Sequence, residues 1–265
     1  MENKYYLLSV KELCEENEGE RLLRAILDRV DKDRREKAEC MRPGAGRAAS
    51  LGAGLLLQLA VKEALQEGTD GKEWGNRVPE GKRDFPEGME PMDVKKQEVG
   101  AEENMAVYTV SQVLKLLKKT LDLKYIYGRN GKPYLRDYPF YFNLSHSGEY
   151  VFCAISDHEV GVDIQKLGPV DEERIAGRFF TEEECQILAD CSDFIERRKL
   201  FYRMWVRKEA YGKLTGEGIA ATLGKSMLPA DVLAQQDAAP SIYWQEWSLP
   251  EYAIALCGYK CEKNH

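Results

Sequence analysis

The sequence lacks the features of an exported, membrane-spanning or disulfide-stabilised protein. Its seven cysteines are odd in number and scattered without a C-x-x-C pair, so reduced thiols are expected. Cys257 and Cys261 have no matching pair elsewhere, which favours ordinary half-buried thiols over a metal site. No apolar run approaches the roughly 20 residues that cross a bilayer, and the start of the chain lacks the order of a signal peptide. We therefore expect a cytoplasmic protein without a membrane segment.

Basic residues are fewer than acidic residues. The chain has 38 basic and 45 acidic residues and a net charge of -7, which argues against general nucleic-acid binding. A local basic segment remains at residues 31–47. With 265 residues, of which 43% are hydrophobic, the chain can form one large domain or two small ones with real cores.

Periodic apolar patterns predict helices and strands in both halves of the chain. The expected helices span residues 18–41, 47–66, 110–121, 173–190 and 197–214. The expected strands span residues 4–10, 140–145, 150–155 and 160–165, with two short runs around a turn in 123–135 and a closing hairpin in 241–260. This mixture, with antiparallel-looking hairpins, predicts the α+β class.

Residues 68–104 interrupt the pattern with Gly, Pro, Glu and Lys and no apolar period. Such a composition buries too little apolar surface to fold by itself. We expect a mobile insertion, for which a solvated surface loop without function is the simplest interpretation.

The stretch G-V-D-I-Q, residues 161–165, ends an apolar run. Asp163 and Gln165 are two residues apart, so both side chains project from one face of a strand, while Val162 and Ile164 face the core. A carboxylate and an amide oxygen side by side can bind a hard cation such as Mg²⁺. A polar strand end that faces solvent is the alternative.

The stretch W-V-R-K-E-A-Y-G-K, residues 205–213, has helical spacing. Trp205, Glu209 and Lys213 are four residues apart and share one helix face. A solvated Glu–Lys pair would look the same. We interpret Trp205 and its neighbour Phe201 as core and cleft wall rather than as a cofactor site.

Further anion-binding groups lie in two predicted turns. N-L-S-H-S-G places Ser145 and His146 between strands, where amides, a hydroxyl and an imidazole can hold a phosphate. G-K-P places Lys132 in a rigid turn. A Ser–His hydrolase is disfavoured, because neighbouring side chains point opposite ways and no G-x-S-x-G elbow is present.

Taken together, these segments resemble the 4′-phosphopantetheinyl transferases of the surfactin-synthetase-activating (Sfp-like) type. The resemblance covers most of the chain except residues 68–104, and it depends on the order and spacing of several motifs. These motifs are G-K-P-Y (131–134), F-N-L-S-H-S (142–147), G-V-D-I-Q (161–165), R-F-F-T-E-E-E (178–184), W-V-R-K-E-A-Y-G-K (205–213) and a basic region around R-R-E-K-A-E-C-M (34–41) and Arg47.

The resemblance implies two similar α+β halves related by a pseudo-twofold, with the active site in the cleft between them. We place these halves at residues 1–143 and 144–265. It also implies an enzyme that moves the 4′-phosphopantetheine group of coenzyme A to a serine of an apo acyl or peptidyl carrier protein, leaving adenosine 3′,5′-bisphosphate. A monomer without nucleic-acid or membrane partners is expected.

The same resemblance assigns roles to residues. Asp163, Gln165 and Glu209 would bind Mg²⁺ against the pyrophosphate of coenzyme A, and Lys213 would contact the α-phosphate. Glu209, directly or through a water, is the preferred base for the carrier serine. Lys208 is expected to assist Lys213 at the α-phosphate. The residues expected to hold the 3′-phosphate and adenosine end are Arg34, Lys37, Arg47, Lys132, Ser145 and His146.

Gln165 departs from the family pattern, because many members have Glu at this position. We expect weaker metal binding or an altered metal preference, with activity retained. A non-catalytic module that binds coenzyme A or a nucleotide is the main alternative, although Asp163, Glu209 and Lys213 together argue against it. A Mg-dependent phosphohydrolase ranks last, because the sequence lacks a second acidic cluster of the D-x-D kind.

Overall fold

The computed structural model describes residues 4–14, 16–68, 107–229 and 242–259. The insertion expected at 68–104 therefore lies almost entirely outside the described residues. Contacts divide the chain into two units, the first reaching His158 and the second beginning at Glu159. The boundary expected after residue 143 falls inside a strand. Residues 144–158 belong to the first unit, because strands β5 and β6 pair within its sheet as far as Ser156.

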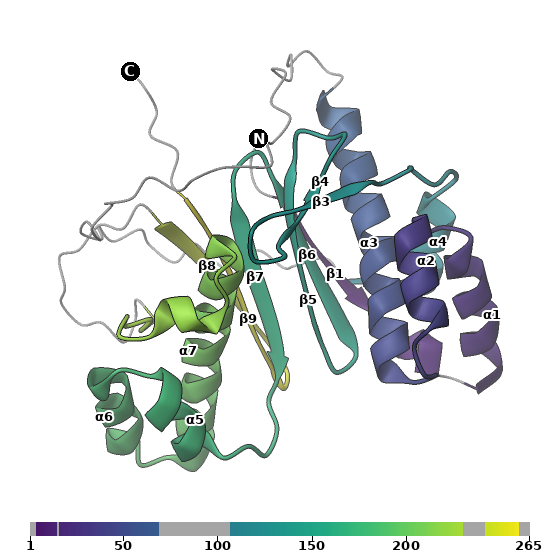
Figure 1. The fold of residues 1–265 in the computed structure, drawn as a ribbon. Helices are drawn as coiled ribbons and strands as arrows, with labels where there is room; N and C mark the ends of the chain where they lie inside the picture. The colour runs from purple at the N-terminus through teal and green to yellow at the C-terminus, as the bar shows by residue number, and fades with distance from the viewer. Residues whose placement is uncertain (1–3, 15, 69–106, 230–241, 260–265) are drawn as a thin grey trace, which may run out of the picture. The chain divides into compact units, whose positions relative to one another are not determined.

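The first unit contains a four-stranded sheet in the order β2-β1-β6-β5. Strand β1 is parallel to β2 and antiparallel to β6, and β5 and β6 form a hairpin. Helices α1 to α4 gather on one face of this sheet (Figure 1). The bounds are β1 Lys4–Ser9, η1 Lys11–Cys14, α1 Glu16–Leu27, α2 Lys32–Glu39, α3 Ala45–Gly68, β2 Val107–Thr109, α4 Val110–Leu116, β3 Tyr125–Tyr127, β4 Pro133–Leu135, β5 Tyr141–Ser147 and β6 Tyr150–Ser156.

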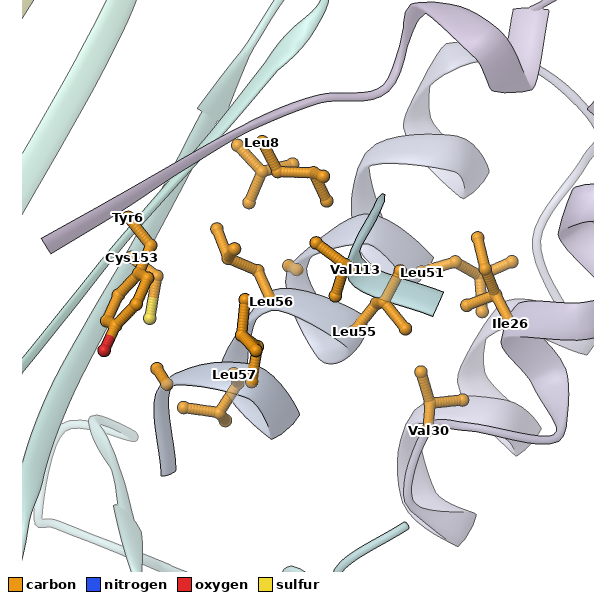
Figure 2. Packing of buried hydrophobic residues seen from close by; sticks show 14 of the residues in the cluster. Tyr6, Leu8, Ile26, Val30, Leu51, Leu55, Leu56, Leu57, Val113 and Cys153 are labelled. Carbon is orange, nitrogen blue, oxygen red and sulfur yellow. The ribbon is translucent and has the colours of Figure 1, made fainter. Parts of the chain in front are cut away.

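Helix α3 is the centre of the first core. It is apolar on nearly all sides, and its residues Leu51, Leu55, Leu56 and Leu57 have no exposed surface, as expected of a helix surrounded by packing partners (Figure 2). Gly52 allows close approach to β1 and the residue after it, since a Cβ there would lie 2.6 Å from Val10 Cγ1 and 3.3 Å from Leu8 Cδ2. By length and composition α3 could cross a membrane, contrary to the expectation that no run is long enough. Because 83% of its most apolar window is buried in the protein, this is weak support for a membrane span.

The helix expected over residues 18–41 is two helices. Helix α1 ends at Leu27, and α2 begins after Asp31, whose carboxylate accepts a hydrogen bond from the Arg34 amide at 2.9 Å. The other oxygen of Asp31 accepts a hydrogen bond from the Tyr125 hydroxyl at 2.9 Å. An N-cap that is also tied to β3 fixes the start of α2, so the apolar stripe cannot continue as one straight helix.

The second unit contains a three-stranded antiparallel sheet in the order β7-β9-β8. Helix α7 packs on this sheet, with Met204, Ala210 and Leu214 in the same buried cluster as Ala255 and Cys257 of β9. The bounds are β7 Val160–Lys166, α5 Glu172–Phe179, α6 Glu182–Asp190, α7 Phe194–Thr215, η2 Ile219–Thr222, β8 Ile242–Leu249 and β9 Tyr252–Tyr259. The expected α+β class is confirmed.

Two local signals set the helix ends in this unit. The helix expected over 173–190 divides at Phe180, because Thr181 and Glu184 form a capping box that starts α6. Helix α7 ends at Gly216, which has a left-handed φ of 73°. The chain then returns over the last turn of α7, where a Cβ on Gly212 would lie 2.5 Å from the Gly218 carbonyl group.

Candidate functional site

Strand β7 carries the first part of the candidate site. Asp163 lies in the middle of this strand, opposite Ala255 of β9, and is only 1% exposed. Gln165 lies two residues further along and is half-buried. Val162 and Ile164 are fully buried, as expected. The strand interior therefore holds a carboxylate that an ordinary solvent-facing strand end would expose.

Gly161 brings this strand unusually close to helix α7. A Cβ on Gly161 would lie 2.1 Å from the Ala210 carbonyl oxygen and 2.5 Å from the Leu214 amide nitrogen. Both atoms belong to the helix backbone, so a side chain at this position could not be accommodated by rotation of a neighbour. The absence of a side chain places Asp163 within reach of the helix turn that follows Ala210.

Helix α7 carries the second part of the site. The Lys213 ammonium lies 2.7 Å from Asp163 Oδ1, and its side chain is 30% exposed. Burial raises the pKa of the Glu209 carboxyl, the charge of Asp163 raises it further, and Lys213 lowers it. The structure thus brings the three residues expected to be catalytic into one electrostatic environment.

These side chains suit a divalent cation chemically. Asp163 and Glu209 repel each other, and an added cation would relieve the repulsion that raises the Glu209 pKa. Carboxylate and amide oxygens are the ligand types that Mg²⁺ accepts. Across the described part of the chain, no group of three or more His, Cys, Asp or Glu side chains could hold a metal ion. The donor set is therefore limited to two carboxylates, with Gln165 as the expected third oxygen donor.

Lys208 occupies a different place from the one expected. Its side chain has no exposed surface, and its ammonium lies 2.9 Å from Glu184 Oε2. It also donates a hydrogen bond to the Lys225 carbonyl oxygen at 2.9 Å. Adjacent residues on a helix point about 100° apart, so Lys208 is directed into the protein while Glu209 is only partly buried. In this position Lys208 cannot contact a phosphate.

The aromatic residues next to the site are packing residues. Trp205 stacks on Phe201 with ring centroids 6.4 Å apart, and it meets Phe179 edge-on at 5.7 Å. Phe201 is 1% exposed. The interpretation of this stripe as core is confirmed.

The first unit holds the residues expected to bind the nucleotide end of coenzyme A. Arg34 and Lys37 lie on α2, Arg47 lies on α3, and Lys132 precedes β4. Lys37 is exposed, whereas Lys132 is 9% exposed and lies 5.8 Å from the ring centroid of Tyr134. Arg34 packs over α3, where a Cβ on Gly54 would lie 2.8 Å from Arg34 Cγ.

The turn predicted for Ser145 and His146 was wrong. Both residues lie in β5, which continues to Ser147, and the reversal comes at Gly148 with a φ of 55°. Because neighbours in a strand point to opposite faces, Ser145 is buried at 7% exposure while His146 is exposed. These two side chains therefore do not share one face.

Sequence reasoning missed two supporting residues. Tyr125 donates to Asp31, which caps the helix that carries Arg34. Glu184 pairs with Lys208 from the start of α6. The T-E-E-E pattern at 181–184 signals a capping box, but only the tertiary structure identifies the lysine that meets it.

A known family matches the part of the chain that contains this site. The sequence model of the 4′-phosphopantetheinyl transferase superfamily matches residues 159–257. The chain is 42% identical over 139 residues to the 4′-phosphopantetheinyl transferase psf-1 of Bacillus pumilus, a match that covers 49% of this chain and 58% of the relative. It is 38% identical over 151 residues to the 4′-phosphopantetheinyl transferase Sfp of Bacillus subtilis, covering 51% of this chain and 63% of the relative.

A cyanobacterial relative gives a similar match. The chain is 40% identical over 153 residues to the 4′-phosphopantetheinyl transferase HetI of a Nostoc species, covering 52% of this chain and 62% of the relative. The chain thus spans about three fifths of the length of these curated relatives.

Proposed function

We propose that this chain, whose residues 159–257 match the sequence model of the 4′-phosphopantetheinyl transferase superfamily, transfers the 4′-phosphopantetheine group of coenzyme A to a serine of an apo carrier protein. The other product is adenosine 3′,5′-bisphosphate. The observation that carries this proposal is the 2.7 Å contact between Lys213 and Asp163 beside Glu209. These groups lie in the matched segment and suit a diphosphate and its cation.

Different residues of the second unit would bind the pyrophosphate and its cation. Asp163 and Glu209, with the amide oxygen of Gln165, would hold Mg²⁺, which neutralises phosphate charge and polarises the phosphorus when it is bound. Lys213 would exchange part of its contact with Asp163 for a phosphate oxygen. Its ammonium then stabilises the negative charge that develops during transfer.

Glu209 is the proposed base. The serine oxygen of the carrier forms a bond to the β-phosphorus, the bond from that phosphorus to the bridging oxygen breaks, and the serine proton passes to Glu209. The leaving adenosine 3′,5′-bisphosphate keeps the bridging oxygen. In the metal-free protein, burial and the Asp163 charge raise the pKa of Glu209, and a bound cation would offset that rise. The proposed role of Glu209 as base, directly or through a water, therefore depends on its place beside Asp163 and Lys213 and not on this shift.

The basic residues of the first unit would bind the nucleotide end of coenzyme A. Arg34, Lys37 and Arg47 supply positive charge on two helices, and charge-assisted hydrogen bonds to phosphate are strong. Lys132 is the further candidate, and His146 is the exposed one of the two β5 residues. An acyl or peptidyl carrier protein is the proposed partner, and a monomer is the proposed state.

A carrier-mass assay tests this function. The protein is mixed with coenzyme A, Mg²⁺ and apo acyl or peptidyl carriers, and each carrier is weighed by mass spectrometry. A gain of one phosphopantetheine group supports the transferase. Binding of coenzyme A without that gain would instead indicate a non-catalytic module.

Two variants link the activity to the site. Asp163→Ala and Glu209→Ala should each abolish the gain in carrier mass while the circular dichroism spectrum is retained. The matched control is Lys199→Ala, because Lys199 lies on the same helix as Glu209 but is 53% exposed in a surface pair with Glu196. Full activity in either acidic variant would remove the proposed metal site.

A further inference from the structure

The core of the second unit contains an ion pair that the proposed transfer does not use. Glu184 and Lys208 both have no exposed surface, and their charged atoms lie 2.9 Å apart. Charged side chains are rarely buried so completely unless they are paired. Lys208 directly precedes Glu209 on α7, so the pair anchors the helix at the proposed site.

The pair joins three segments that are distant in sequence. Glu184 Oε2 accepts a hydrogen bond from the Thr181 amide at 2.8 Å, and Oε1 accepts one from the Met227 amide at 2.6 Å. Lys208 donates to the Lys225 carbonyl oxygen at 2.9 Å. Two side chains thereby connect the start of α6, the segment that follows η2, and the middle of α7.

Stability alone is a poor explanation for such a pair. Burying two charges has a large desolvation cost, and replacing a buried pair by apolar groups of similar size is often neutral or stabilising. A fully hydrogen-bonded pair restricts the groups around it to a single arrangement. Lys208 is fixed by Glu184 and Lys225, so the helix can neither rotate nor slide here without breaking these bonds.

The opposite side of the same helix turn is also fixed. The Ala210 carbonyl lies against Gly161 of β7 so closely that no Cβ fits between them. Glu209 lies between these two constraints along the chain, and Lys213 follows one turn later. The helix is therefore held from both sides at the residues that meet Asp163.

We infer that the Glu184–Lys208 pair is a positioning device that holds Glu209 and Lys213 in register with Asp163 for binding a divalent cation. The inference rests on the proposed function only in assigning that cation to this site. Supporting groups around metal ligands typically contribute about 10- to 100-fold to metal affinity. The Glu184–Lys208 pair would contribute to metal affinity in the same way, by fixing the helix backbone next to Glu209.

The test compares metal binding with folding. The double variant Glu184→Gln/Lys208→Met removes both charges and keeps an amide oxygen that can accept the Thr181 hydrogen bond. Binding of Mn²⁺ in the presence of coenzyme A is followed by the loss of the free-ion electron paramagnetic resonance signal, and folding is followed by urea denaturation. Lys199→Met is the control, because it removes an exposed lysine from the same helix.

We expect the double variant to unfold cooperatively and to bind Mn²⁺ about tenfold more weakly than wild type, with the control unchanged. Wild-type Mn²⁺ affinity in the folded double variant would overturn the inference. If the double variant does not fold, Glu184→Gln alone receives the same measurements. Failure of both to fold would show that the pair serves folding rather than position.

These results also separate the inference from the proposed function. A wild-type protein that binds Mn²⁺ but adds nothing to any carrier would refute the transferase and leave the positioning test valid. A wild-type protein that modifies the carrier, with a folded double variant of unchanged Mn²⁺ affinity, would refute only the positioning role.

Discussion

Replacing Gly161 by alanine should damage the site through the backbone alone. The new Cβ would lie 2.1 Å from the Ala210 carbonyl oxygen, 2.5 Å from the Leu214 nitrogen and 2.9 Å from its Cα, whereas ordinary contact begins near 3.4 Å. Helix α7 would have to move away from β7 by about 1 Å to restore normal contact. The new methyl group would point at the backbone of α7, so a loss of activity would report this movement.

Two magnitudes follow from that displacement. Overpacking a close contact costs about 1–3 kcal/mol of stability, and the upper end is expected because backbone atoms cannot rotate away. A misplacement of about 1 Å can lower a catalysed rate by roughly a hundredfold. We therefore expect Gly161→Ala to fold with reduced stability and to transfer phosphopantetheine about a hundred times more slowly.

The assay pairs urea denaturation with the initial rate of carrier modification. Gly177→Ala in helix α5 is the control, because a Cβ there meets nothing within 4 Å. It should stabilise the protein by about 0.5–1 kcal/mol, since alanine is the better helix former, and leave the rate unchanged. A Gly161→Ala protein with wild-type stability and wild-type rate would show that the contact between β7 and α7 does not position the site.

Three further predictions concern the metal site and the core. Gln165→Glu should lower the Mg²⁺ concentration needed for half-maximal carrier modification, because a third carboxylate attracts the cation; an unchanged titration would count against contact with the metal. In metal-free protein, the raised pKa of Glu209 adds stability at pH values below its unfolded-state pKa. That added stability is lost as the pH rises through its folded-state pKa. Glu209→Gln should therefore flatten the fall in unfolding free energy with rising pH, and an unaltered urea-denaturation profile against pH would contradict this. Leu55→Ala, at a position with no exposed surface, should cost about 2–5 kcal/mol, and a loss below about 1 kcal/mol would mean that the α3 core repacks.

The sequence was sufficient where local chemistry determines structure. The alternation in G-V-D-I-Q correctly predicted a strand. The four-residue spacing of Glu209 and Lys213 correctly predicted that both lie on one helix, while their proximity to Asp163 was an implication of the family resemblance. The helix expected to end at residue 214 ends at Thr215, before the left-handed Gly216. Each signal depends on the period of one element or on the conformation of one residue, both of which can be read from neighbouring residues.

The sequence-based predictions were wrong where tertiary contacts determine the position of a side chain. Ser145 and His146 were placed in the turn between two expected strands, but pairing of β5 with β6 extends the strand to Ser147. Lys208 was expected at a phosphate because of the family resemblance. Its carboxylate partner, Glu184, is 24 residues away in sequence and comes from another helix. No local pattern reports such a partner, so the buried role of this lysine required the structure.

The return of the chain over Gly212 has a consequence for variation in this protein. Gly216 and Gly218 reverse the backbone with φ values of 73° and 70°, and the segment that follows supplies the Lys225 oxygen to Lys208. A bulkier residue at Gly212 would displace that segment and remove one acceptor from a lysine four positions earlier. Mutational tolerance at these glycines should therefore depend on what occupies position 208, so that compensatory changes at the two places arise together.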